Sequence, residues 1–427
     1  MTRTLITFLG RVAGRGRLYN TASYEFDELS REDAASCGST PYTNSYFGLA
    51  LIKHLGNVGR PPDRVVVFGT SGSIWDEFLA TMLDDVFTGE DRETLREQAE
   101  NGQVTTEQLD CWQAALRAAM KEQYGTEEID LRILSSHLVS PDEQIGLVRE
   151  ITEAVRHQDR IVLDVTHGFR HLPLLSCFAA LTMRRIRRAQ VEGIYYGAWE
   201  MRDTEGIAPV ARLDGLLQII DWLSAFEVSE ATGDLSVFEP ALRQIDSPAE
   251  IIVNVREAGF FRNSGQFEKA AGAFDAANVA LETADTASPL LAVFAGELKE
   301  RIKLLQGTQY KRLRGVALEA LDVGRLDTAA DFGLDAARER IRSVYHYVRQ
   351  STGSKEIDRA LLQSRAARSA KDAFIRLRGI RNWLAHSGNV TMPRGDVSAA
   401  MLDHDSCRDA LREDLELLLP ANKQQRF

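Results

Sequence analysis

Arg160–Arg170, RIVLDVTHGFR, joins a short run of β-branched and aliphatic residues to a turn that contains glycine. The run Arg160–Val165 is typical of a buried strand, and an amphipathic helical pattern follows at Leu172–Arg188. Arg64–Ser73, RVVVFGTSGS, repeats this arrangement, and a helical pattern again follows its turn, from Ile74. Two strand–turn–helix segments of this kind predict an α/β fold in which small and polar residues follow the ends of parallel strands.

The same alternation extends through the first half of the chain. Further strands are predicted at Thr4–Leu9, Asp130–Leu138 and Val191–Tyr196, and Gly197–Asp214 is expected to form a hairpin. Helical patterns occupy Asn44–Leu55, Ile74–Asp85, Thr106–Lys121 and Pro141–Arg156. Because the strands are continuously apolar rather than alternating, we expect helices on both faces of a mostly parallel sheet.

The second half of the chain shows only helical patterns. They lie at Leu213–Phe226, Pro248–Ala258, Phe267–Thr283, Pro289–Leu305, Lys311–Leu321, Thr328–Arg349, Lys355–Ala385 and Ser398–Leu419. A helix-poor stretch rich in Ser, Gly, Asp and Pro at residues 228–248 predicts a boundary between an α/β part and an all-α part. We therefore predict an α/β domain over residues 1–227, followed by an all-α region.

The composition is that of an ordinary globular protein, with 44% hydrophobic and 26% charged residues among 427. The four cysteines have no zinc-ligand spacing and indicate free thiols in a reducing compartment, so no metal is expected. The N-terminus lacks the apolar stretch of a signal peptide, and no run of about 18 apolar residues occurs. These features predict a cytoplasmic protein with no membrane partner.

The net charge of −11 at first argues against a nucleic-acid partner, but the charge is unevenly distributed. Residues 251–427 carry 27 Lys and Arg against 23 Asp and Glu, whereas residues 1–250 carry 24 against 39. The acidic first part and mildly basic second part are compatible with RNA contact by the C-terminal region. The asymmetry alone does not establish such contact.

Two turns at strand ends are candidate ligand sites. Small residues in the first turn let a backbone approach a ligand, and the following helix offers unpaired N–H groups to an anion. The same residues also fit a simple strand-to-helix turn with a serine cap. Hydroxyl, imidazole and guanidinium groups in the second turn suit contacts with a phosphate or a base, although a histidine in a turn is often purely structural. The residues concerned are Gly69, Thr70, Ser71, Gly72 and Ser73 in the first turn, and Asp164, Thr166, His167, Gly168 and Arg170 in the second.

A third turn follows the first predicted strand. Leu9 and Gly10 begin a loop in which Arg11, Arg15 and Arg17 are interspersed with three glycines. Such a loop can cradle phosphate groups, but it also fits a solvated loop without a ligand. Of the two interpretations the solvated loop is favoured for this third turn, whereas the first two turns are expected at the carboxyl edge of a parallel sheet, where such sheets bind ligands.

The segment Arg381–His386, RNWLAH, lies near the end of a predicted helix, with Ser387 and Gly388 behind it. Gly388 suits a helix C-cap, and the helix dipole there favours a protonated histidine. Asn382 and His386 share one face, whereas Arg381 lies roughly 140° away from His386 around the helix. One copy therefore cannot aim both groups at one point, but two copies facing each other could. A solvated arginine with a capping histidine is the simpler interpretation of the spacing alone.

Together these segments resemble the CRISPR-associated CARF–HEPN ribonucleases of the DxTHG branch. D-V-T-H-G at Asp164–Gly168 looks like the motif that names this branch, and FLG near the N-terminus and G-T-S-G-S-I-W-D at Gly69–Asp76 are similar to other motifs of it. R-N-W-L-A-H is similar to the R-x-x-x-x-H motif of HEPN ribonucleases. The resemblance reaches both ends of the chain, whereas residues 228–330 match no motif that we can name.

The resemblance implies a Rossmann-like CARF domain that dimerises and binds cyclic oligoadenylate through the three strand-end turns, Gly10 included. It implies a helical linker or insert over residues 228–330 and an all-α HEPN-like domain over residues 331–427. Arg381, Asn382 and His386 would form a composite site with their dimer mates and cut single-stranded RNA without a metal or other cofactor. The products would carry 2′,3′-cyclic phosphate and 5′-hydroxyl ends. The ring size of the activator and an oligomer larger than a dimer stay open.

Other functions fit parts of the sequence. A sensor that binds cyclic oligoadenylate but carries a catalytically silent helical domain agrees equally well with the composition. The strand-end site could also cleave its own cyclic ligand slowly through Thr166 and His167, as the resemblance implies for some relatives. A dinucleotide-dependent oxidoreductase is disfavoured, because no G-x-G-x-x-G follows the first strand.

Overall fold

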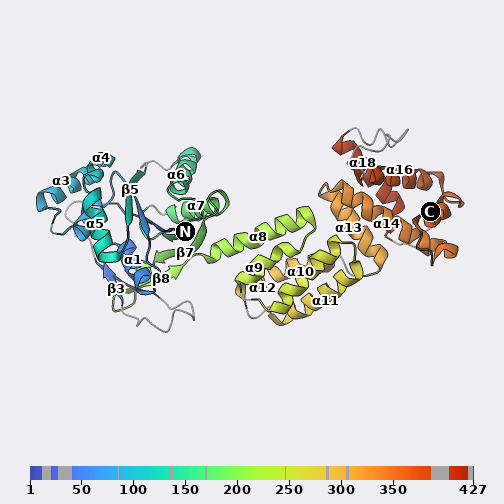
Figure 1. Cartoon of the computed structure of the whole chain (residues 1–427), viewed down its shortest axis with the longest axis horizontal. Coiled ribbons are helices and arrows are strands. Elements are labelled where there is room, and N and C mark those ends of the chain that lie inside the picture. The colour runs from blue at the N-terminus through green and yellow to red at the C-terminus, as the bar shows by residue number, and fades with distance from the viewer. Residues whose placement is uncertain are drawn as a thin grey trace. The chain divides into compact units, whose positions relative to one another are not determined.

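The computed structural model describes residues 1–11, 21–26, 41–84, 86–134, 139–168, 171–245, 247–284, 288–303, 307–385, 403–421 and 427. The chain divides into two compact units, Met1–Leu217 and Gln218–Phe427, which we call unit 1 and unit 2 (Figure 1). In the part of the chain just specified, no helix is both long enough and apolar enough to span a membrane.

Unit 1 is built around an eight-stranded sheet with the order β3-β2-β8-β7-β6-β1-β4-β5. All neighbouring strands are parallel except the β2–β3 and β7–β8 pairs. The predicted mostly parallel sheet is confirmed, and the expected hairpin corresponds to the antiparallel β7–β8 pair. The strands are β1 (Arg3–Phe8), β2 (Ala22–Glu25), β3 (Tyr42–Asn44), β4 (Arg64–Thr70), β5 (Glu128–Leu134), β6 (Arg160–Asp164), β7 (Gln190–Gly197) and β8 (Ile207–Arg212).

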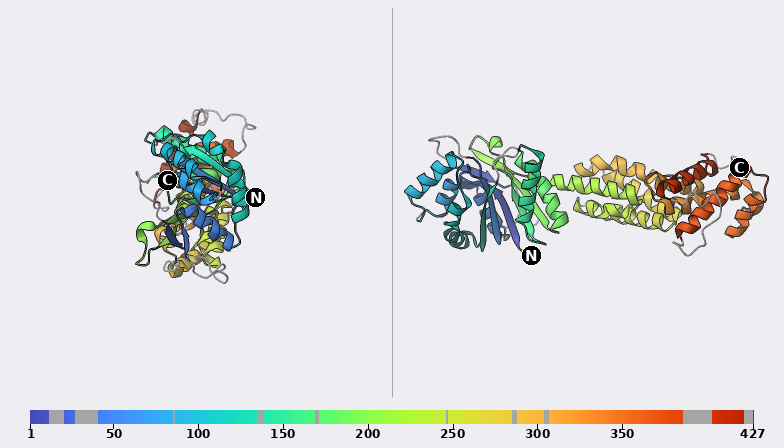
Figure 2. Two further views of the ribbon diagram at one scale, coloured as in Figure 1. Left: turned by 90° about the vertical axis from the view of Figure 1, so that its left-hand side faces the viewer. Right: turned by 90° about the horizontal axis from the view of Figure 1, so that it is seen from above.

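Helices cover both faces of this sheet (Figures 1 and 2). Side chains alternate between the faces along β1, so Leu5 joins the core beneath α1, α2 and α5, while Ile6 and Phe8 join the core beneath α6 and α7. Double-sided burial explains the continuous apolar strands. The helices of unit 1 are α1 (Phe47–Asn57), α2 (Trp75–Met82), α3 (Gly89–Glu100), α4 (Thr106–Asp110), α5 (Gln113–Tyr124), α6 (Pro141–Glu153) and α7 (Leu172–Ile186).

The carboxyl ends of three strands meet at one edge because β1 lies between β4 and β6. Phe8 is in register with Phe68, and Ile6 is in register with Leu163. The chain runs outward from β1 through β4 to β5, and then returns to place β6 on the other side of β1. Such a reversal of strand order opens a crevice at the carboxyl ends of the strands, where sheets of this kind bind ligands.

Unit 2 is helical and shares one apolar core. Buried residues from Trp222 to Leu419 form a single cluster. Within it, α14 packs against α13, α15, α16 and α18. The predicted all-α region is therefore confirmed. Its helices are α8 (Gly215–Thr232, which begins in unit 1), α9 (Glu239–Gln244), α10 (Ala249–Asn263), α11 (Phe267–Ala284), α12 (Pro289–Lys303), α13 (Gln309–Asp322), α14 (Leu326–Val344), α15 (Ser354–Leu362), α16 (Arg368–Ala385) and α18 (His404–Leu418).

Some predicted boundaries differ from those in the structure. The units divide at Leu217–Gln218, and α8 continues to Thr232, past the predicted end of the first domain. The predicted helix Lys355–Ala385 is two helices in the structure, because α15 ends at Leu362 and α16 begins at Arg368. The separate domains 228–330 and 331–427 remain predictions, and in the structure their helices share one core.

Candidate functional site

The first and third turns are tied together at the sheet edge. Leu9 N donates to Phe68 O at 2.7 Å, and Ile74 N donates to Gly10 O at 3.0 Å. Arg11 also forms an isolated antiparallel bridge with Ser73. These backbone contacts place Gly10 and the Gly69–Ser73 turn side by side, although the residues alone favoured a solvated loop at Gly10.

Ser73 serves mainly to shape its own turn. Its hydroxyl accepts from Thr70 N at 2.9 Å and donates to Leu9 O at 3.2 Å, and the residue is 1% exposed. Gly69 is required for packing, because a Cβ atom there would lie 2.5 Å from the ring of Trp75. Thr70 and Ser71 are only partly buried, so their side chains are better placed than that of Ser73 to meet a ligand.

The second candidate turn is anchored through Asp164, which is fully buried at the end of β6. Its carboxylate accepts from the Thr7 hydroxyl at 2.5 Å and from Thr166 N at 2.8 Å. Burial raises the pKa of Asp164, while His167 and these hydrogen bonds oppose that shift. The carboxyl group therefore joins β1 to the turn and does not face a ligand.

The next two motif side chains also have partners within unit 1. The Thr166 hydroxyl accepts from Gly197 N at 2.8 Å. His167 Nε2 accepts from Phe47 N at 3.2 Å, and the ring stacks on Tyr46 with centroids 5.5 Å apart. An accepting Nε2 requires a neutral imidazole, in agreement with burial, which lowers the pKa of His167. These contacts hold β6, β7 and α1 together and argue against slow ligand cleavage by Thr166 and His167.

A cavity of about 230 Å³ opens where the three turns meet. Its floor is apolar and includes the stacked rings of Phe8 and Phe68, whose centroids are 5.6 Å apart. Gly168 borders it with φ of +107°, a conformation that favours glycine. Arg170, Arg15 and Arg17 lie outside the described residues. The lining consists of Phe8, Leu9, Arg11, Phe68, Gly69, Thr70, Ser73, Leu134, Gly168 and Leu172.

Arg11 also lines the cavity, although the sequence did not establish whether its loop binds a ligand. Its backbone is fixed by the bridge to Ser73, and its exposed side chain passes Gly72, with Nε 3.9 Å from the position of a Cβ on that glycine. The guanidinium is therefore a cation at the rim of an otherwise largely apolar cavity. An apolar floor with a cationic rim suits a ligand that combines flat bases with phosphate groups.

In unit 2, Arg381 and Asn382 lie in the last turns of α16. Arg381 Nε donates to Asp331 Oδ1 on α14 at 2.6 Å, and its Nη1 donates to Asn382 Oδ1 at 3.4 Å. Asp331 thereby orients the guanidinium, and the arginine stays about one-third exposed, with 37% of its side chain accessible. His386 lies outside the described residues, so its position relative to Arg381 stays a prediction.

A second contact fixes α16 against α18. Arg376 donates to the carboxylate of Asp414 through Nε and Nη2 at 2.7 to 3.1 Å. Asp414 is fully buried, and burial raises its pKa to about 6, although Arg376 opposes the shift. This two-pronged pair limits the movement of the helix that carries Arg381.

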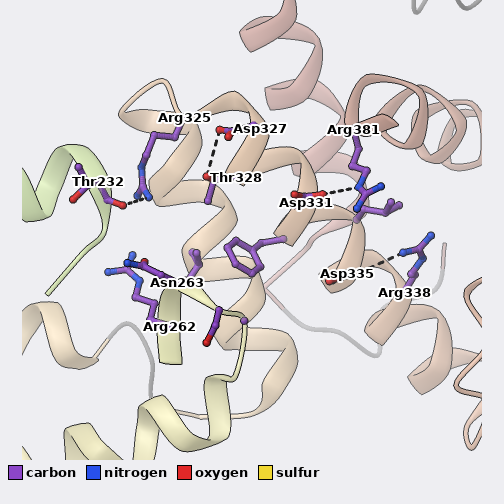
Figure 3. A pocket seen from close by; sticks show the side chains of 15 residues that line it. Thr232, Arg262, Asn263, Arg325, Asp327, Thr328, Asp331, Asp335, Arg338 and Arg381 are labelled. Atoms are coloured by element: carbon purple, nitrogen blue, oxygen red, sulfur yellow. Dashed lines mark hydrogen bonds and ion pairs between the residues drawn. The ribbon is translucent and has the colours of Figure 1, made fainter. Parts of the chain in front are cut away.

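Arg381 also borders a larger polar cavity of about 550 Å³ within unit 2 (Figure 3). The cavity joins α14 to α10 and to the turn before α14. Both α10 and that turn lie within residues 228–330, which the sequence left without a function. No local motif could have indicated the cavity, because its arginines come from positions far apart in the chain. They are Arg262, Arg325, Arg338 and Arg381.

Two comparisons with known proteins extend these observations. Residues 4–200 match the family described as CRISPR system endoribonuclease Csx1, CARF domain. The CRISPR-associated protein MJ1674 of Methanocaldococcus jannaschii is 23% identical over 228 residues, which cover 48% of this chain and 32% of that protein. The match thus spans about a third of the relative's length.

The family match covers the three turns of unit 1 and its sheet apart from β8, and it includes the carboxyl ends of β1, β4 and β6. It ends before the helices of unit 2 begin. Sequence similarity and fold therefore agree that unit 1 is similar to the CARF domains of CRISPR-associated proteins.

Proposed function

We propose that this chain is an endoribonuclease that cuts single-stranded RNA when a cyclic oligoadenylate binds its CARF domain. The observation that carries the proposal is Arg381, which stands on the wall of a polar cavity, held by Asp331, in a chain that also has a CARF domain. Such a protein would act in type III CRISPR defence in the cytoplasm. The family to which residues 4–200 are similar is itself described as an endoribonuclease.

The ligand would occupy the edge of the sheet at the ends of β1, β4 and β6. Arg11 and Thr70 line the cavity there and offer charged and hydroxyl donors, with the partly buried Ser71 next to Thr70 in the chain. At Gly69 and Gly168 the turn backbone borders the cavity without a side chain. The adenine bases would lie against the apolar floor. A ring with several identical nucleotides suits a binding site repeated in two copies of the domain.

The cutting reaction needs no metal. The 2′-oxygen of the RNA would attack the adjacent phosphorus, the bond to the 5′-oxygen would break, and the proton lost from the 2′-hydroxyl would be balanced by one given to the leaving oxygen. Arg381 would stabilise the charge on the phosphorane oxygens. His386 would assist the proton transfer, because an imidazole can both accept and donate a proton. Asn382 would orient the phosphate or the imidazole.

A homodimer would bring two copies of this motif together. On α7, Leu174, Phe178 and Ile186 are 61%, 54% and 66% exposed, and Ile145 on the adjacent α6 is 67% exposed. Leu174 and Phe178 are four residues apart and share one face of the helix. An apolar face of this kind supports pairing of two copies through α6 and α7.

Phe178→Arg is expected to shift the protein from dimer to monomer and to lower ligand-triggered cutting at least about tenfold, because a buried unpaired charge is costly at an interface. Mass photometry measures the dimer fraction, and a cleavage assay measures the rate. Phe260→Arg is the matched control, because Phe260 is a 63% exposed phenylalanine on α10 in unit 2. A Phe178→Arg protein that remains dimeric would contradict pairing through α7.

The proposed function is tested by mixing the pure protein in EDTA with an RNA that carries a fluorophore and a quencher, with or without cyclic tetra-adenylate or hexa-adenylate. We expect one ring to trigger cutting and the RNA fragments to end in 2′,3′-cyclic phosphate. Ligand binding without any cutting would instead establish the silent sensor. Cutting that requires an added metal ion would contradict the chemistry.

A further inference from the structure

Two arginines meet at the end of the unit 2 cavity that is opposite Arg338 and Arg381 in Figure 3. Arg262 closes α10, and Arg325 precedes α14. Their guanidinium groups both lie against Gly233, where an added Cβ would be 2.8 Å from Arg325 Nη1 and 3.1 Å from Arg262 Nη2. Gly233 has φ of +70° and no side chain, which permits this approach.

The hydrogen bonds of these two cations are unequal. Arg262 is 3% exposed and donates to Glu319 Oε2 at 2.5 Å. Arg325 Nη1 donates to Thr232 O, but its Nε and Nη2 are buried and have no hydrogen-bond partner among the described residues. Burial, and secondly the charge of Arg262, lower the pKa of Arg325. Unsatisfied cationic donors beside a second cation favour an anion at this end of the cavity.

The start of α14 adds backbone donors at the same place. Among the described residues, the N-cap residue of this 19-residue helix, Arg325, makes no side-chain capping hydrogen bond, and Asp327 and Thr328 in the first turn line the cavity. Free N–H groups at a helix N-terminus attract anions. The first-turn carboxylate Asp327 is exposed at the surface.

The rest of the cavity connects this end to the proposed nuclease site. Asp331 and Asp335 face Arg381 and Arg338, with N–O distances of 2.6 and 3.4 Å, so paired cations offset their charges. The aromatic ring of Phe332 is partly buried and also lines the cavity. Grooves that bind single-stranded nucleic acid combine cationic side chains for the phosphates with aromatic rings on which the bases stack.

We propose that Arg262 and Arg325 bind a non-scissile phosphate of the RNA substrate, so that the chain runs along α14 towards Arg381. This subsite rests on the proposed function for the identity of its ligand. Arg325 would donate through Nε and Nη2 to the phosphate oxygens, and the first turn of α14 would supply backbone N–H donors. A cavity of about 550 Å³ is large enough for one nucleotide.

The test measures affinity without cutting. An RNA with 2′-O-methyl groups at every ribose is bound in EDTA at several salt concentrations, and fluorescence anisotropy gives each Kd. Arg325→Gln should weaken binding roughly tenfold and reduce the slope of log Kd against log salt by about one, since one phosphate contact is lost. Arg325→Lys, which keeps the charge, should retain the slope with a smaller loss of affinity.

Arg243→Gln is the matched control, because Arg243 is 59% exposed outside the cavity. If the salt slope of Arg325→Gln equals that of this control, the subsite is overturned. A salt slope of Arg325→Lys that is reduced by about one would also overturn the subsite, and this second test works even if Arg325→Gln does not fold. Arg325-dependent binding of free adenosine monophosphate with an unchanged RNA slope would overturn the assignment to RNA. If RNA is cut in a way that depends on Arg381 but binds equally well without Arg325, only the subsite is overturned. If RNA binding depends on Arg325 but no RNA is cut, only the nuclease function is overturned.

Discussion

Arg381→Ala is expected to lower ligand-triggered RNA cutting at least about a hundredfold while leaving cyclic oligoadenylate binding unchanged. The guanidinium is the group that would meet the charge developing on the phosphorane, and losing one such donor typically costs a factor of about 10² to 10³ in rate. Arg381→Lys should recover only part of the rate, because an ammonium cannot be held by Asp331 and contact the phosphate with the same fixed geometry. Single-turnover cleavage with saturating activator measures the effect.

The control for this substitution lies on the same helix. Arg368 starts α16, and its side chain is 96% exposed in a weak pair with Asp372 at 3.8 Å. Arg368→Ala removes an equal charge from α16 without touching the cavity, so its cutting rate should match that of the wild type. Equal cutting rates for Arg381→Ala and Arg368→Ala would place the chemistry away from Arg381, whereas activator binding with no cutting by the wild type would favour the silent sensor.

Burial explains which strands could be predicted. β1, β4 and β6 are covered on both faces, so their sequences are continuously apolar and recognisable. β2 and β3 were missed, because a four-residue strand with alternating burial and a three-residue strand at the sheet edge carry little apolar signal. Strands this short form because they pair with neighbouring strands, and their own residues carry too little signal to predict them.

Burial also explains why helix α3 was missed, whereas the break between α15 and α16 has another cause. Only Leu95 and Ala99 of α3 are buried, so its sequence has no apolar stripe. The break between α15 and α16 falls at Gln363–Ala367, which contains neither proline nor glycine. The interruption is set by packing rather than by a local signal.

The sequence predicted that the candidate turns would meet, but not how their side chains would be used. Asp164, Thr166 and His167 bond to Thr7, Gly197 and Phe47, partners between 31 and 157 positions away. Local chemistry indicated that the side chains of Thr166 and His167 could contact a phosphate or a base. In the structure these side chains form hydrogen bonds within unit 1. The residues that line the cavity include Arg11, whose loop was also compatible with a solvated loop that binds no ligand.

The position of Arg11 at the cavity leads to the second prediction with a large expected effect, a loss of affinity for the activator. Arg11→Glu is expected to weaken cyclic oligoadenylate binding roughly a hundredfold, because it removes a cation and places a carboxylate at the cavity rim beside the ligand's phosphates. Isothermal titration with cyclic tetra-adenylate and hexa-adenylate measures the change and identifies the ring. The backbone should persist, since the Gly10 and Ser73 contacts that fix this turn involve main-chain atoms.

Lys121→Glu provides the matched charge reversal. Lys121 is 62% exposed near the end of α5, just before β5 begins, and therefore lies at the opposite edge of the sheet from the cavity. A general effect of negative charge on an anionic ligand would weaken binding equally in both variants, whereas a site at the strand ends predicts loss in Arg11→Glu alone. Equal affinities for Arg11→Glu and the wild type would move the ligand away from this edge.

The two large effects separate sensing from cutting when measured on the same RNA. Arg11→Glu should raise the activator concentration needed for half-maximal cutting and approach the wild-type rate at saturation, because Arg381 and its partner Asp331 are untouched. Arg381→Ala should bind activator normally and stay inactive at every concentration. If both variants instead lost only their maximal rate, the cavity of unit 1 would not be the sensor, because a ligand controls a switch only through its affinity for the switch's states.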